Sequence, residues 1–121
     1  MQPNPGLPSV DVQEANRRVT GDAATKPLIV DVREPDEFAA VRVDGVAFVP
    51  MSRFADEMAK LPKDRPLLIL CASGSRSSAV TAHLLRNGFT DVANVTGGIT
   101  EWQRAGLPVR RGPIAPGEGD L

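Results

Sequence analysis

Cysteine and histidine are nearly absent from this 121-residue chain, which holds one of each. A single cysteine cannot form an internal disulfide, so the composition fits a reducing compartment and we expect a cytoplasmic location. The two residues also fall short of the roughly three or four protein ligands that a zinc site needs, so we expect no metal. The Gly97-Gly98 pair is too weak a signal for a nucleotide site, and we expect no cofactor.

The sequence also lacks an excess of charge and any long apolar run. Fourteen basic and fifteen acidic side chains leave a net charge of −1, whereas a nucleic-acid-binding domain would carry a basic excess. No stretch reaches the roughly 18 apolar residues of a membrane span. The first residues, Met1 to Gly6, lack the basic start and apolar run of a signal peptide. We therefore expect neither nucleic acid nor membrane as a partner.

The length suits one domain, and a hydrophobic content of 41% is enough for a single core. Prolines and glycines gather at both ends, where few apolar residues could offset the ordering entropy. We therefore expect a loose N-terminal tail over residues 1–8, a folded domain over 9–110 and a flexible C-terminal tail over 111–121.

Strand and helix patterns alternate between these tails. Asp11 followed by Glu14 predicts a capping box for a helix that runs to about Val19, and Pro35 predicts a first helical turn with Phe38 facing inward. Short apolar runs predict strands at 28–30, 47–49, 67–70 and 92–95. Apolar residues at helical spacing predict three further helices. One covers 54–61, one runs from the loop after Cys71 to Gly88, and one covers 99–105. The alternation predicts an α/β fold, with a mostly parallel sheet covered by helices on both faces.

The loop Cys71-Ala72-Ser73-Gly74-Ser75-Arg76-Ser77 begins where the 67–70 strand ends, and sites in parallel sheets lie at the carboxyl ends of strands. Its small residues let the backbone turn N–H groups inward as an anion-holding nest, and the following helix adds its positive end. Such surroundings lower a cysteine pKa to roughly 3.5–7.5, and Arg76 would supply a further positive charge. We therefore predict that Cys71 is a nucleophile. The alternative of a buried small hydrophobe does not account for the four small residues and the arginine that follow.

Further motifs accompany this loop in a fixed order. They are Asp31-Val32-Arg33 with Glu34 and Glu37, Gly45 and Pro50, Gly88-Phe89, and Gly97-Gly98 with Trp102. On this set the chain resembles a single-domain rhodanese, a sulfurtransferase, over about residues 9–110. It departs from the family pattern at Arg42, inside what is usually Gly-His-Ile, and at Phe48, which replaces the usual Asn before Pro50.

The resemblance implies a rhodanese-like fold, a five-stranded, mostly parallel sheet with helices on both faces. It also implies that Cys71 takes the outer sulfur of a small-molecule donor such as thiosulfate, releases sulfite, and holds a persulfide until cyanide or a thiol accepts the sulfur. Cys71 and Arg76 would be the catalytic residues, and Arg33 would steer an anionic donor. The residues expected to bind the substrate through the loop are Ala72, Ser73, Gly74, Ser75 and Ser77.

Several alternatives stay open on the sequence. A cysteine phosphatase or arsenate reductase also surrounds a thiolate with loop amides, but its signature is Cys-x5-Arg, whereas this chain has Cys-x4-Arg. A sulfur relay, which exchanges a persulfide with a partner protein, would need the same loop chemistry as a free-standing enzyme. Arg33 could instead be a structural ion-pair partner, and Asp31 is expected to belong to an Asp–Arg pair that braces the loop. His83 is expected to be a surface or packed residue, because an amide-stabilised thiolate needs no imidazole base.

Overall fold

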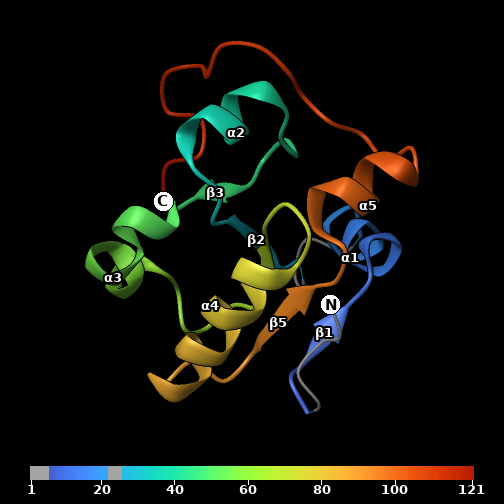
Figure 1. Ribbon diagram of the computed structural model, residues 1–121. Helices are drawn as coiled ribbons and strands as arrows, with labels where there is room; N and C mark the ends of the chain where they lie inside the picture. The colour runs from blue at the N-terminus through green and yellow to red at the C-terminus, as the bar shows by residue number, and fades with distance from the viewer. Residues whose placement is uncertain (1–5, 22–25) are drawn as a thin grey trace.

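The computed structural model describes residues 6–21 and 26–121, and its elements alternate between strand and helix (Figure 1). The strands are β1 (Ser9–Val10), β2 (Leu28–Asp31), β3 (Ala47–Phe48), β4 (Leu67–Leu70) and β5 (Val92–Val95). The helices are α1 (Val12–Val19), α2 (Pro35–Ala40), α3 (Phe54–Glu57), α4 (Ser75–Arg86) and α5 (Gly98–Arg104), with 3₁₀ turns η2 (Met51–Arg53) and η3 (Met58–Lys60) on either side of α3.

The five strands form one sheet in the order β1-β5-β4-β2-β3, and every pairing is parallel. The predicted α/β fold with a five-stranded parallel sheet is therefore confirmed. β4 lies at the centre and all four of its residues are buried, as expected for a continuous apolar run between two neighbours. The pattern did not predict β1, because a strand of two residues carries no periodicity.

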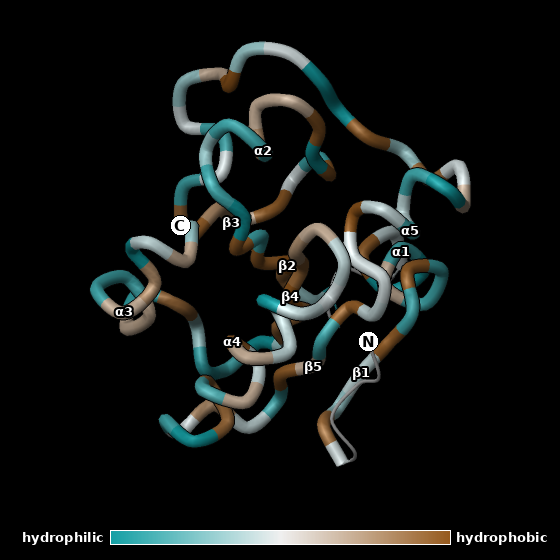
Figure 2. The backbone as a smooth tube through the Cα atoms, in the orientation of Figure 1, coloured by the Kyte–Doolittle hydropathy of each residue, from teal (hydrophilic) through white to brown (hydrophobic). Residues whose placement is uncertain are grey.

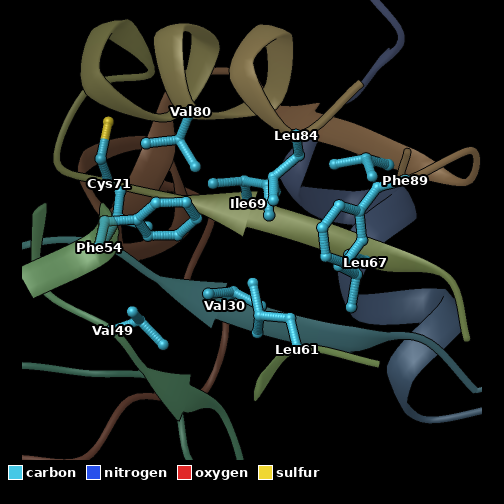
Figure 3. Packing of buried hydrophobic residues seen from close by; sticks show 12 residues of the cluster. Val30, Val49, Phe54, Leu61, Leu67, Ile69, Cys71, Val80, Leu84 and Phe89 are labelled. Atoms are coloured by element: carbon cyan, nitrogen blue, oxygen red, sulfur yellow. The ribbon is translucent and has the colours of Figure 1, made fainter. Parts of the chain in front are cut away.

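Helices cover both faces of the sheet. On one face α3 and α4 pack Phe54, Val80 and Leu84 over the central strands, in the cluster drawn in Figure 3. On the other face α1, α2 and α5 contribute Val12, Ala15, Phe38, Ile99 and Trp102 to a second cluster. Figure 2 shows hydrophobic residues along the central strands and hydrophilic ones in the outer helices and loops. No helix within 6–21 or 26–121 is long and apolar enough to cross a bilayer.

Two predicted helices differ in detail from the structure. Asp11 caps α1 by accepting the N–H of Glu14 at 2.8 Å, but the Glu14 carboxylate binds Arg17 and Arg18 rather than closing the capping box. The predicted 54–61 helix is divided into α3 and a 3₁₀ turn, after which Leu61 stands outside any helix. Leu61 nevertheless packs into the core as its spacing indicated, because one 3₁₀ turn preserves roughly the same facing direction.

The segment 111–121, expected to be a flexible tail, folds back over α2 and β3 (Figure 1). Arg42 explains this difference: its guanidinium is fully buried and binds the Glu118 carboxylate and the carbonyls of Gly112 and Pro113. A buried charge must be paired, and these acceptors all lie in the returning segment. The Phe48 N–H also donates to the Gly119 carbonyl at 2.7 Å. Both departures from the family pattern, Arg42 and Phe48, therefore contact this segment. Of the expected N-terminal tail, residues 1–5 lie outside the described residues.

Candidate active site

Cys71 follows β4 directly, at the carboxyl edge of the sheet, and the loop of Ala72, Ser73 and Gly74 leads into α4. Its side chain is fully buried at one end of the core cluster. Figure 3 shows the sulfur pointing toward the first turn of α4. The predicted placement, with the thiol between a buried strand and a helix N-terminus, is what the structure shows.

Two backbone N–H groups and one hydroxyl surround the Cys71 sulfur. The N–H of Gly74 lies 3.1 Å from Sγ, the N–H of Ser77 lies 3.3 Å away, and the Ser77 hydroxyl lies 3.2 Å away. Gly74 can aim its N–H at the sulfur because it adopts φ +105°, which disfavours any residue with a Cβ. The loop therefore closes on its own cysteine as an amide-lined ring.

These contacts decide the acidity of the thiol. Burial raises the pKa of Cys71, but the hydrogen bonds from the Ser77 hydroxyl and from the N–H groups of Ser77, Gly74 and Ser73 outweigh burial, and the resulting pKa lies below the ordinary value. Hydrogen bonds to the charged form favour that form, and a thiolate is the nucleophilic form of cysteine.

Arg76 lies at the start of α4 and forms a bidentate pair with Glu37 of α2, at 2.7 and 2.8 Å. This pair holds the pKa of Glu37 at about 2, chiefly through the hydrogen bonds from Arg76. The sequence predicted that Arg76 supplies a fixed positive charge at the end of the loop. In the structure most of that charge is offset by Glu37, so the thiolate is stabilised mainly by hydrogen bonds, and Arg76 ties the loop to α2.

Arg33 differs from the expectation of a steering residue. Only 2% of it is exposed, and it grips the fully buried Asp31 carboxylate through Nε and Nη2. Nη2 also donates to the Val41 carbonyl at 2.6 Å and Nη1 to the Glu37 carbonyl at 3.3 Å. This is the structural ion pair that the sequence left open, and it fixes α2 beside the end of β2. The arginine of the Asp–Arg pair expected for Asp31 is thus Arg33.

The first turn of α5 forms hydrogen bonds to the loop that begins at Cys71. The N–H of Ile99 donates to the Cys71 carbonyl at 2.9 Å, and the N–H of Thr100 donates to the Ala72 carbonyl at 3.1 Å. This close approach requires Gly98, because a Cβ there would lie 2.3 Å from the Cys71 carbonyl oxygen. The Ala72 carbonyl is fixed on this side, and the N–H of the same peptide, that of Ser73, helps to lower the pKa of Cys71.

The other loop residues predicted to bind substrate differ in exposure. Ser73 and Ser75 are exposed and Ala72 is half-buried, so they form the outer rim of the loop. Ser77 is fully buried against the sulfur. His83 lies further along α4, beside Met51 and Phe54 in a shallow apolar hollow, consistent with a packed or surface histidine.

Sequence reasoning missed Asn94 of β5. Its side-chain Oδ1 accepts the Ser77 hydroxyl at 2.5 Å, which links it to Cys71. The available signal was a polar residue two positions after Val92, in a strand of otherwise apolar character. Since side chains alternate along a strand, that spacing places Asn94 on the same buried face as Val92.

Comparisons with known proteins agree with this geometry. The profile of the rhodanese-like domain family matches residues 11–105. A sulfurtransferase of Allochromatium vinosum is 40% identical over 82 residues, which cover 68% of this chain and 77% of the relative. The thiosulfate sulfurtransferase GlpE of Pseudomonas putida is 34% identical over 63% of this chain and 69% of its own length. The probable adenylyltransferase/sulfurtransferase MoeZ of Mycobacterium tuberculosis is 35% identical over 72% of this chain, which spans only 23% of that longer protein.

Among solved structures, a rhodanese-related protein of Thermoplasma volcanium superposes with a TM-score of 0.78 at 26% identity. The match covers 86% of this chain and 98% of that one.

Proposed function

The chain belongs to the rhodanese-like domain family, and from this premise we propose that it is a sulfurtransferase that carries a transferable sulfur on Cys71. The observation that carries the proposal is the ring of two backbone N–H groups and the Ser77 hydroxyl around the buried Cys71 sulfur, at 3.1 to 3.3 Å. Relatives that match most of their length to this chain are sulfurtransferases, and one is a thiosulfate sulfurtransferase. The donor we propose is thiosulfate or another sulfane sulfur compound.

The reaction has two displacement steps. In the first, a lone pair of the Cys71 thiolate attacks the outer sulfur of thiosulfate; the new S–S bond forms as the old one breaks, and sulfite leaves with the bonding pair. In the second, cyanide or a thiolate attacks the outer sulfur of the persulfide, and Cys71 leaves as a thiolate. In each step the transferred sulfur gains one bonding electron pair from the nucleophile and loses one to the leaving group, so no external oxidant or reductant is needed. Splitting the transfer through a covalent intermediate predicts ping-pong kinetics.

The loop supplies the electrostatic part of this chemistry. The persulfide's outer sulfur is anionic, and the N–H groups of Ser75 and Arg76 belong to the first turn of α4, where no preceding helical carbonyl can accept them. These groups, with the helix dipole, would hold the outer sulfur as an oxyanion hole holds an oxygen. Ala72 and Ser73 would line the approach, and Arg76 would fix the ring through Glu37.

The size of the ring argues against phosphoryl or arsenate chemistry. Cys-x4-Arg encloses a smaller space than Cys-x5-Arg, and here the donors of Gly74 and Ser77 already converge on one sulfur atom. A tetrahedral oxyanion would need donors spaced around four centres. We therefore propose a site for a single anionic sulfur.

The test is the intact mass of the chain after incubation with thiosulfate. We expect a gain of one sulfur atom, removed by cyanide with formation of thiocyanate, and no gain in Cys71→Ser. Cys71→Ser must first be shown to fold, because Cys71 belongs to the core cluster. Thiocyanate formation that survives the substitution, or hydrolysis of aryl phosphates without any persulfide, would refute the assignment. Loading from a protein persulfide much faster than from thiosulfate would identify a relay.

A further inference from the structure

We propose that Asn94 is a positioning residue, whose side-chain amide holds the Ser77 hydroxyl against the Cys71 sulfur. The importance of Asn94 for sulfur transfer rests on the proposed function. The geometry around Asn94 and the alkylation experiment below do not depend on it. The two displacement steps assign no role to this residue, which lies in β5 rather than in the Cys71 loop.

Asn94 lies in β5, between the edge strand β1 and the central strand β4. It is in register with Ile69 of β4 on one side and Ser9 of β1 on the other, and it is 2% exposed. An amide in such a place costs free energy unless each polar atom finds a partner. Both do: Oδ1 accepts the Ser77 hydroxyl at 2.5 Å, and Nδ2 donates to the Ser78 hydroxyl at 3.0 Å. Among the residues that the structure describes, the side-chain partners of the amide are thus the two serines of the first turn of α4.

The hydroxyls of α4 offer an internal comparison. Ser78 donates to the Gly74 carbonyl and Thr81 donates to the Ser77 carbonyl, each at 2.7 Å. Bonding to the carbonyl four residues earlier is a common local choice for a helical hydroxyl. The Ser77 hydroxyl does not bond to the carbonyl four residues earlier; it lies between Asn94 and Cys71 instead. The amide of Asn94 is the group that draws it there.

Asparagine also suits both protonation states of the cysteine. While Cys71 is a thiol, its S–H can donate to the Ser77 oxygen and the Ser77 O–H to Oδ1. When the sulfur is anionic, the Ser77 proton must turn toward it. A half-turn of the amide then lets Nδ2 donate to the Ser77 oxygen, while the Ser78 hydroxyl turns from the Gly74 carbonyl to donate to Oδ1. One planar amide holds both a donor and an acceptor, so the chain stays complete in either state.

The charged side chains near the Cys71 sulfur are paired with one another, so they do not mask the effect of the Ser77 hydroxyl on the acidity of Cys71. Arg76 of α4, which the Cys71 charge reaches, is paired with Glu37 of α2. Asp31 and Arg33 of β2 and its loop neutralise each other. Because both pairs are close to neutral, a change in the orientation of the Ser77 hydroxyl is expected to show directly in the acidity of Cys71.

The experiment measures the alkylation rate of Cys71 by iodoacetamide against pH, in a chain that has no other cysteine. We compare Asn94→Ala, Ser77→Ala and the double variant, with Thr81→Val as the matched control, because it too removes a buried hydroxyl bond from α4. Losing one hydrogen bond to the thiolate should raise the midpoint by about one pH unit, which is about tenfold less thiolate at neutral pH. We expect both single variants to rise, the double variant to equal Ser77→Ala, and Thr81→Val to keep the native midpoint.

Two results would overturn the proposal: a native midpoint in Asn94→Ala, or a double variant whose shift is the sum of the two singles, which would show that Asn94 does not act through Ser77. If Asn94→Ala fails to fold, Asn94→Asp replaces it. That carboxylate can accept from Ser77 but cannot donate, so an unchanged midpoint there also refutes the idea. Failure of both thiosulfate and a protein persulfide to load the native chain would instead refute the proposed function and leave these midpoints interpretable.

Discussion

Gly98→Ala tests whether α5 positions the loop that begins at Cys71. Gly98 adopts φ +57°, and an added Cβ would lie 2.3 Å from the Cys71 carbonyl oxygen and 2.6 Å from the carbonyl carbon and oxygen of Ala72. All three are backbone atoms, so no flexible side chain can move aside. Either α5 or the loop must shift, and the bonds from Ile99 and Thr100 to these carbonyls are strained in both cases.

The structure sets the size of the effect. Ordinary contacts of a Cβ begin at 3.4 Å, so relief requires a movement of roughly 1 Å, and misplacement on that scale can reduce a rate by about 10²-fold. The positive φ adds about 1–2 kcal/mol of destabilisation for any residue with a Cβ. Gly106 separates the two contributions: its φ is +75°, and nothing lies within 4 Å of an added Cβ.

We therefore expect Gly106→Ala to lose stability in urea unfolding and to keep the native rate of thiosulfate-to-cyanide transfer. Gly98→Ala should lose both stability and about 10²-fold in rate, and its cysteine should alkylate with a raised pH midpoint. A folded Gly98→Ala chain with native transfer and a native midpoint would show that contact with α5 does not set the loop geometry.

Two further predictions follow from side chains away from the loop. His83→Gln should transfer sulfur at close to the native rate, because no proton transfer is assigned to it; a loss of about 10²-fold in a folded variant would indicate general acid–base catalysis. The hydrogen bonds from Arg42 hold the pKa of Glu118 at about 2, below its ordinary 4.5, so this pair stabilises the fold fully above about pH 4.5 and its contribution is lost as pH falls toward 2. Urea unfolding of Glu118→Gln should accordingly vary less over that interval than the native chain, and equal pH dependence would contradict the pairing.

The sequence predicted those parts of the site whose determinants are adjacent along the chain. A strand, a cysteine, small residues and a helix start follow one another within 67–77, so the amide ring around Cys71 could be foreseen from local rules alone. The alternation of apolar runs likewise predicted four of the five strands. β1 was too short to produce a pattern, although it pairs with β5 in regular register.

Contacts between distant segments could not be predicted in this way. Glu37 meets Arg76 across 39 positions, and Asn94 meets Ser77 across 17. A residue such as Arg33 presents the same charge whether it faces a substrate or a buried aspartate, and only the fold decides between them. The proline and glycine content of 111–121 similarly indicated little ordering, because the buried Arg42 that attracts Glu118 lies 76 positions earlier.

The return of residues 111–121 to β3 has a consequence for how the chain avoids associating with itself. β3 is an edge strand, and the outward N–H of Phe48 is bonded to the carbonyl of Gly119. An uncovered edge can template pairing with another chain. Because the covering segment comes some 70 residues later along the sequence, β3 can pair with β2 well before its outer side is closed. During synthesis or refolding, that interval is when the molecule would be most exposed to strand-to-strand aggregation.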